Sequence, residues 1–132
     1  MAKINIDHRY LATEEIRKDV LPYKAYCECL INTFDLSQVK SVCDIGCATG
    51  HLIYFLKQNH NMEVKGYEYF GYHVDSEHCK VKDDITVYDI RDGLPDDIKQ
   101  YDIVNCSEVG EHIDKEYVNI LHLLTFQMPI FI

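Results

Sequence analysis

The chain of 132 residues carries 22 acidic and 13 basic side chains, and its formal net charge is −9 at pH 7. Because 47% of its residues are hydrophobic, the composition excludes a disordered chain, and the length favours one domain across residues 1–132. The charge is uneven: residues 1–60 are neutral, whereas residues 61–132 hold fifteen acids against six bases. An acidic surface repels a phosphate backbone, which argues against a general nucleic-acid binder.

Neither a membrane span nor a secretion signal is visible in the sequence. No segment approaches the roughly 18 uninterrupted apolar residues of a span, and the first residues lack the apolar run of a signal peptide. The six cysteines form no CxxC pair, and Cys43 and Cys106 lie in apolar runs that are typical of buried strands. We interpret them as reduced, mostly buried thiols rather than disulfides or zinc ligands, which favours a cytoplasmic protein.

The N-terminal segment, residues 1–38, is expected to be helical. Thr13 can cap a helix over residues 13–33, and Pro22 divides that helix into two segments. The second segment carries apolar residues at the spacing of one helical face, namely Tyr23, Tyr26, Cys27, Leu30, Ile31 and Phe34.

The rest of the chain, residues 39–132, alternates strand-like and helix-like segments. Helices are expected around Leu52–Leu56 and from Asp114 to Thr125. Apolar runs predict five strands, at residues 41–45, 63–68, 84–90, 101–106 and 128–132. This alternation predicts an α/β fold with a parallel sheet, right-handed crossovers and helices on both faces.

Four acidic residues lie at or near the ends of consecutive predicted strands. Asp44, Glu68, Asp89 and Glu108 are separated by 24, 21 and 19 residues, about one strand and helix each. In such sheets ligands bind outside the carboxyl ends of the strands, so these acids are expected to line one rim. The glycine-containing turn at residues 46–50 lies on the same rim, where glycine lets the backbone approach a ligand. The sequence therefore predicts a nucleotide or nucleoside pocket.

The residues around this turn limit the class of nucleotide or nucleoside that the pocket can bind. A phosphate-binding loop needs a lysine after the second glycine, and His51 stands there instead. A dinucleotide pyrophosphate would be crowded by Asp44, which lies two residues before Gly46. A carboxylate at that place suits an ammonium or sulfonium group, so a cationic adenosine derivative is favoured.

Four motifs in order carry a resemblance to class I S-adenosylmethionine-dependent methyltransferases. Residues 42–51 resemble the first motif of the family, with Ala48 in place of its middle glycine. Residues 66–69 are similar to the second motif, residues 87–90 to the third, and residues 101–113 to the fourth in its E-V-x-E-H-I form. The resemblance implies a Rossmann-like fold with S-adenosylmethionine as cofactor. About five strands of the family's seven-stranded sheet are expected, without its last two.

The same resemblance implies a role for each matching residue. It places Asp44 beside the amino-acid end of the cofactor, Glu68 on the ribose hydroxyls and Asp89 on the adenine amino group. Ala48 is nearly as small as glycine and suits its place if its φ is negative. The full set of implied cofactor-binding residues is Asp44, Gly46, Cys47, Ala48, Gly50, Glu68, Tyr69, Asp89, Ile90, Ser107 and Glu108.

Glu111 and His112 are the candidate catalytic residues. Methyl transfer to a hydroxyl requires a group that takes its proton, and His112 is the natural general base. The alternative is that His112 only orients the loop after the fourth strand. Small-RNA 2′-O-methyltransferases hold a metal with a similar cluster, which Glu108, Glu111 and His112 match in part, but the further strand-end histidine is missing, so no metal is expected.

Two other groups of residues have an ordinary structural interpretation beside a functional one. Tyr67, Tyr69 and Tyr72 can stack on a substrate ring, although core and interface packing is the commoner reason for such tyrosines. His73, His78 and Cys79 suggest zinc, yet no second paired motif accompanies them.

These features together predict a methyltransferase that acts on a small molecule or metabolite, with a hydroxyl as a favoured acceptor. One alternative is a cofactor-binding module, or an incomplete enzyme that needs a partner chain or further strands. Another is cleavage or sequestration of the cofactor. The chain ends with its predicted fifth strand, and residues 126–132 are almost all apolar. Since exposed apolar edges are usually avoided, we expect a homo-oligomer or a partner chain at that edge.

Overall fold

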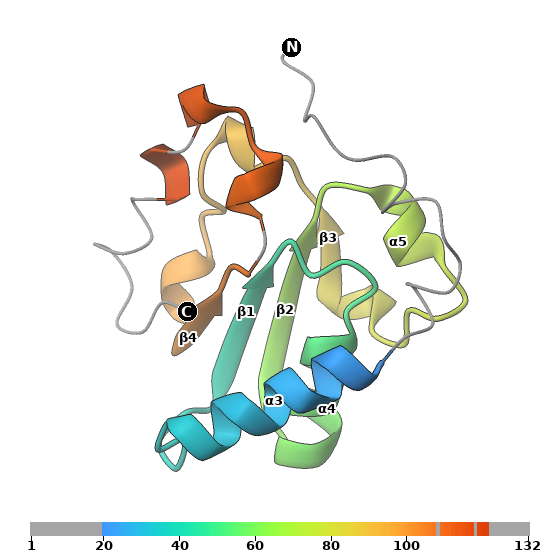
Figure 1. Ribbon diagram of the computed structural model, residues 1–132, viewed down its shortest axis with the longest axis vertical. Coiled ribbons are helices and arrows are strands. Elements are labelled where there is room, and N and C mark those ends of the chain that lie inside the picture. The colour runs from blue at the N-terminus through green and yellow to red at the C-terminus, as the bar shows by residue number, and fades with distance from the viewer. Residues whose placement is uncertain (1–19, 108, 118, 122–132) are drawn as a thin grey trace.

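The computed structural model describes residues 20–107, 109–117 and 119–121. Its core is a parallel sheet of four strands in the order β3-β2-β1-β4 (Figure 1). The strands are β1 (Ser41–Ile45), β2 (Glu63–Glu68), β3 (Ile85–Val87) and β4 (Ile103–Asn105). The α/β fold with a parallel sheet is therefore confirmed, and its switch in strand order lies beside β1.

The central strand β1 is buried along its whole length. It pairs with β2 from Ser41↔Glu63 to Ile45↔Tyr67 and with β4 from Val42↔Ile103 onward. A strand with neighbours on both sides and cover on both faces reads as a continuous apolar run, which explains why its bounds were predictable. The bounds of β2 also match the prediction.

The two faces of the sheet are covered differently. Helices α3 (Leu21–Thr33) and α4 (His51–His60) pack on one face, where Leu30, Ile53 and Leu56 are buried. Figure 1 shows these two helices side by side across the lower half of the sheet, with the short helix α5 (Gly71–Asp75) near β3. The opposite face holds a second apolar cluster around Ile45 and Val104. In the described part of the chain, the elements that follow β3 and β4 toward this cluster are mainly short 3-10 turns. They are η2 (Ile90–Asp92), η3 (Ile98–Gln100), η4 (Gly110–His112) and η5 (Lys115–Tyr117).

Strands β3 and β4 are shorter than predicted because local side-chain caps replace strand pairing at their ends. Beyond β3, Asp89 accepts a hydrogen bond from the Arg91 N–H and starts the 3-10 turn η2 (Ile90–Asp92). Before β4, the Asp102 carboxylate accepts from the N–H groups of Lys40 and Ser41 at the start of β1. Residues 88–90 and 101–102 therefore lie outside the strands, although the Tyr88 N–H still donates to the Glu68 carbonyl. Residue 106 also lies outside β4, and residue 84 belongs to the 3-10 turn η1 (Lys82–Asp84).

Helix α3 begins at Leu21 with Pro22 in its first turn, where the missing N–H of proline is tolerated. Its predicted apolar face is largely confirmed, since Cys27 and Leu30 are buried. Phe34 was wrongly included: the helix ends at Thr33, the backbone becomes extended at Phe34, and that side chain is 37% exposed.

Several predicted elements lie partly or wholly outside the described residues. These are the first helical segment at residues 13–19, the end of the helix predicted from Asp114 to Thr125, and the fifth strand at residues 128–132. The described start of that last helix is the 3-10 turn η5 (Lys115–Tyr117), followed by helical residues 119–121.

All six cysteines are free, and four of them are buried, as predicted. Cys106 is half-buried and Cys29 is exposed. Within the described residues, no helix combines the length and the apolar character that crossing a bilayer requires.

Candidate functional site

A cavity of about 700 Å³ opens at the carboxyl ends of the strands. Cavities of roughly 300–1,000 Å³ are typical of small-molecule sites. The walls come from the segments that follow all four strands and from α3, whose Pro22, Tyr23 and Tyr26 close one side. Ten predicted site residues line it: Asp44, Gly46, Cys47, Ala48, Glu68, Tyr69, Asp89, Ile90, Ser107 and His112. The structure thus brings most of the predicted residues together in one cavity.

The turn after β1 adopts left-handed backbone at three positions. Gly46 has a φ of 73°, and a Cβ there would collide with Val109. Ala48 has a φ of 50°, so the expectation of a negative φ is wrong. A residue with a Cβ adopts this region at a cost of about 1–2 kcal/mol, which means that Ala48 strains the turn beneath the cavity.

Gly50 does not line the cavity, although the resemblance implies a cofactor contact. It is the N-cap of α4 with a φ of 78°. A Cβ at this position would lie 2.6 Å from Val81 and 2.9 Å from Ile85. The glycine therefore serves the close packing of α4 against the segment that leads into β3.

Glu68 joins the turns that follow β1 and β2. Its Oε2 accepts a hydrogen bond of 2.6 Å from the Ala48 N–H, and its Oε1 accepts one of 3.0 Å from the Phe70 N–H. Burial raises the pKa of this carboxyl, and the backbone donors oppose that rise. Each carboxylate oxygen has a second lone pair, so Glu68 can hold the loops and still accept from a ligand hydroxyl.

Asp44 lines the cavity and is only 5% exposed. Its Oδ1 accepts a hydrogen bond of 2.7 Å from Nδ2 of Asn105, which is buried in β4. Burial raises the pKa of Asp44 to about 7, the Asn105 hydrogen bond opposes the rise, and the charge of Glu68 adds to it. A cation that enters the cavity would stabilise the ionised form of this carboxyl.

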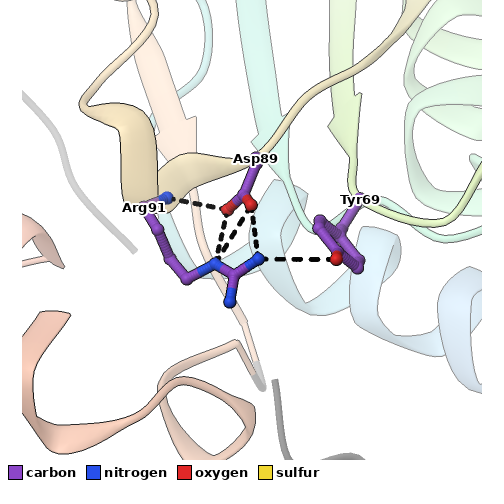
Figure 2. Close-up of polar contacts among 3 residues, drawn as sticks. All are labelled: Tyr69, Asp89 and Arg91. Atoms are coloured by element: carbon purple, nitrogen blue, oxygen red, sulfur yellow. Dashed lines mark hydrogen bonds and ion pairs between the residues drawn. The ribbon is translucent and has the colours of Figure 1, made fainter. Parts of the chain in front are cut away.

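Asp89 stands at the other end of the rim and is held by a cation. The Arg91 guanidinium donates to it from Nε, at 2.8 Å to Oδ1, and from Nη2, at 2.5 Å to Oδ2 (Figure 2). These hydrogen bonds hold the pKa of Asp89 below its ordinary value. Arg91 also reaches the Tyr69 hydroxyl at 3.4 Å and lies over the rings of Tyr69 and Tyr117. Asp89 is thus oriented before any ligand binds.

The predicted catalytic pair is only partly described. His112 ends the 3-10 turn η4 (Gly110–His112) and lines the cavity together with Val109 and Ile113. Glu108 lies outside the described residues, and for Glu111 the structure describes the backbone within η4. Across residues whose side chains are described, no three His, Cys, Asp or Glu side chains gather into a metal-binding group.

The sequence interpretation missed two cavity residues that organise the site. Asn105 closes β4, and its Oδ1 accepts hydrogen bonds from the hydroxyls of Tyr26 (2.8 Å) and Ser107 (3.0 Å). Tyr26 was seen only as part of an apolar helix face. The hydroxyl of Tyr26 leaves no trace in the spacing of apolar residues, so the sequence pattern could not single it out. Asn105 could have been found, because it is a polar residue at the end of a predicted strand.

The remaining aromatic and histidine residues divide between packing and exposure. The Tyr67 hydroxyl donates to the Asp97 carboxylate, and its ring is buried in the core, as the packing interpretation predicts. Tyr69 and Tyr72 are 37% and 41% exposed, so they are not core residues. His73 is buried and lines the cavity, whereas His78 does not.

The chain is similar to known proteins in its structure, whereas comparison of its sequence finds no relative. No protein-family model matches the chain, and no curated protein sequence matches it. A SAM-dependent methyltransferase from Archaeoglobus fulgidus superposes with a TM-score of 0.67 and 27% identity, covering 92% of this chain and 53% of that one. The magnesium protoporphyrin IX methyltransferase of Synechocystis, with bound SAM, superposes with a TM-score of 0.61 and 19% identity. The match covers 98% of this chain and 62% of that one. A sugar N-methyltransferase from Streptoalloteichus superposes with a TM-score of 0.62 and 15% identity. The match covers 98% of this chain and 51% of that one.

These solved structures share their fold with the present chain. The chain spans only 51% to 62% of their length. Together with the ordered motifs around the cavity, the similarity identifies the architecture. The chain has the Rossmann-like fold of the class I S-adenosylmethionine-dependent methyltransferases.

Proposed function

We propose that the protein is an S-adenosylmethionine-dependent methyltransferase acting on a small molecule. The observation that carries this proposal is the cavity at the carboxyl ends of the strands, with Asp44, Glu68 and Asp89 along its lining. Three carboxylates there disfavour a phosphate and favour a cationic nucleoside. The solved methyltransferase of Synechocystis with bound SAM supports the choice of cofactor.

In this proposal the cofactor lies along the rim with its charged end at Asp44. The ionised carboxylate of Asp44 then faces the ammonium and sulfonium groups, Glu68 accepts from the ribose hydroxyls and Asp89 from the adenine amino group. The backbone turn at Gly46–Ala48 passes beneath the ligand, close enough because the turn carries little side-chain bulk. Ser107, which lines the cavity, lies at the methionine end in this proposal, and Glu108 is assigned to the same end by the motif alone.

The proposed reaction is an in-line displacement at the methyl carbon. An acceptor hydroxyl oxygen forms the new bond to the methyl group while the bond from that carbon to sulfur breaks and S-adenosylhomocysteine leaves. Since the sulfonium is already activated, alignment and exclusion of water supply much of the rate. His112, which lines the cavity, takes the hydroxyl proton in this proposal, and Glu111 is kept as a second candidate catalytic residue on the motif alone.

A second candidate is a cofactor-binding module, or an enzyme that needs further chain. The specific observation in its favour is that this chain spans about half the length of two of the solved methyltransferases reported above. Acceptor sites are built from loops that lie beside the cofactor, so cofactor binding and turnover can separate. The proposal also keeps the expectation of a cytoplasmic protein that forms a homo-oligomer or binds a partner chain. Light scattering showing a clean monomer at micromolar concentration would contradict the homo-oligomer.

Calorimetric titration tests whether the protein binds S-adenosylmethionine, which both candidate functions require. S-adenosylmethionine and S-adenosylhomocysteine are expected to bind, whereas ATP, which carries adenosine with an anionic tail, is expected not to bind because of the acidic lining. Tighter binding of ATP, or no binding of either sulfur compound, would reject the proposed function. Transfer of a labelled methyl group to a panel of small hydroxyl and amine acceptors then separates the enzyme from the binding module.

A further inference from the structure

Tyr26 of α3 reaches across the cavity to the segment that follows β4. Its hydroxyl donates a hydrogen bond of 2.8 Å to Oδ1 of Asn105 and lies 3.0 Å from the Ser107 hydroxyl. These residues are 79 and 81 positions away in the sequence. All three line the cavity, so the contact lies within the site rather than in the core beneath it.

The same hydrogen bonds decide which way the Asn105 amide faces. A side-chain amide has one accepting and one donating end, and a hydroxyl can both donate and accept. The Tyr26 and Ser107 hydroxyls both donate to Oδ1, which leaves Nδ2 to donate to Asp44 at 2.7 Å. An ionised carboxylate only accepts, so this orientation matches the charged form of Asp44.

The surroundings of Asp44 make that one donor important. Glu68 faces it from β2 with a charge of the same sign, and the thiols of Cys43, Cys47 and Cys106 surround it from β1, the following turn and the end of β4. Neither lysine nor arginine occurs among the described residues that line the cavity. The Asn105 amide therefore opposes the desolvation that drives Asp44 toward its neutral form.

We propose that Tyr26 is a positioning residue of the site: its hydroxyl orients the Asn105 amide so that Nδ2 donates to Asp44, which favours the carboxylate form that the cationic end of the cofactor requires. This inference rests on the proposed function, because it assigns Asp44 to a cationic ligand. It makes α3 part of the cofactor site, although Tyr26 belongs to none of the four motifs.

The test compares Tyr26→Phe with the unaltered chain. Phenylalanine keeps the ring that packs against the core and removes only the hydroxyl, so the fold is expected to persist. The affinity for S-adenosylhomocysteine at pH 7 is expected to fall about fivefold, the scale of one hydrogen bond. The affinity is expected to recover above pH 8, because the lost donor raises the pH at which Asp44 ionises. Tyr54→Phe, on α4 and outside the cavity, is the matched control and should leave both the affinity and its pH profile unchanged.

A second measurement determines the pH at which Asp44 ionises in the absence of any cofactor. Carboxyl carbon NMR of protein labelled at aspartate follows the ionisation of Asp44 in the ligand-free protein, with Asp44→Asn identifying its signal. The midpoint is expected to rise in Tyr26→Phe and, in the same direction, in Ser107→Ala, which removes the other donor to Asn105. Unchanged midpoints in both variants, together with unchanged affinity, would overturn the proposal.

Failure of the proposed function gives a different pattern. If the unaltered chain binds neither S-adenosylmethionine nor S-adenosylhomocysteine, the assignment of Asp44 to a cationic cofactor is overturned. The NMR midpoints still decide whether Tyr26 controls the ionisation of Asp44. A normal affinity of the unaltered chain with no effect of Tyr26→Phe overturns only the role of Tyr26.

Discussion

The two ends of the cavity hold the same side chain in opposite electrostatic states. Asp44, near the end of β1, is buried beside the neutral Asn105 amide, and burial raises its pKa to about 7. Asp89, after β3, is paired with the Arg91 guanidinium, which holds its pKa below the ordinary value. Desolvation without a countercharge favours the protonated acid, whereas an adjacent cation favours the carboxylate.

This difference shows how one rim can treat two parts of a ligand differently. Asp89 already has its countercharge, so it offers an oriented acceptor to a neutral donor such as an amino group. Asp44 lacks a cation in the described structure, so a cationic ligand gains most at that end. The proposed cofactor has a neutral adenine at one end. Its methionine end carries a sulfonium and an ammonium beside one carboxylate and is cationic overall, which matches the two acids if the ammonium lies at Asp44.

The largest expected effect comes from removing the charge at the Asp44 end. Asp44→Asn keeps the shape and should weaken S-adenosylmethionine binding about 10- to 100-fold, the scale of a charge-assisted hydrogen bond. The same change should raise the free energy of unfolding at pH 8 by about 2 kcal/mol, because an ionised buried carboxylate is removed. Calorimetry and urea unfolding measure the two quantities. A loss of both affinity and stability would contradict the comparison.

The pH dependence sharpens the comparison with a smaller effect. Affinity for S-adenosylmethionine should rise up to about tenfold between pH 6 and pH 8, as Asp44 ionises through its pKa of about 7. The folded pKa of Asp44 is raised, so its contribution to stability of the ligand-free protein falls as pH rises from about 4 to 7. Asp89 acts in the opposite sense, because its pKa is lowered and its contribution is lost as pH falls. Titrations at three pH values, with Asp44→Asn expected to give a flatter profile, provide the check.

Removing the cation at the Asp89 end should have a weaker effect on binding. Arg91→Met keeps much of the side-chain length and leaves Asp89 with its backbone hydrogen bond but without the guanidinium. We expect about a threefold loss of affinity and about 2 kcal/mol of stability, the scale of a hydrogen bond to a charged group, since the Arg91 side chain is only 4% exposed. Binding and thermal unfolding measure both. If Arg91→Met weakens binding more than Asp44→Asn does, the ranking of the two ends is wrong.

The smallest expected effect lies in the turn beneath the cavity. Ala48→Gly replaces a residue at a φ of 50° and should stabilise the protein by about 0.5–1 kcal/mol. The hydrogen bond from the residue 48 N–H to Glu68 is retained, so cofactor affinity should change less than twofold. Unfolding in urea measures the gain, and a destabilised variant would show that the turn is not strained at this position.

The sequence predicted those parts of the molecule that depend on local pattern. Strands β1 and β2 are interior, so their apolar runs set their bounds, and the acids at their ends lie where parallel topology requires. Strands β3 and β4 were predicted too long because the caps formed by Asp89 and Asp102 depend on geometry that apolarity does not report.

The chemistry of the site was less predictable than its location. Asp44 and Asp89 were both recognised as strand-end acids, but the opposite shifts of their pKa values depend on the burial of Asp44 and on the Arg91 guanidinium beside Asp89, which no motif singled out. The contact between Tyr26 and Asn105 joins residues 79 positions apart, which periodicity cannot reveal. The positive φ of Ala48 is likewise set by the folded turn rather than by residue type.

A crystal structure of the protein with S-adenosylhomocysteine tests most directly whether Asp44 binds the amino-acid end of the cofactor and Asp89 binds the adenine end. The expected result is the ligand ammonium at Asp44, the ribose hydroxyls at Glu68 and the adenine amino group at Asp89, with the Arg91 pairing intact. An empty cavity at saturating ligand, or a ligand bound with its adenine at Asp44, would contradict this assignment.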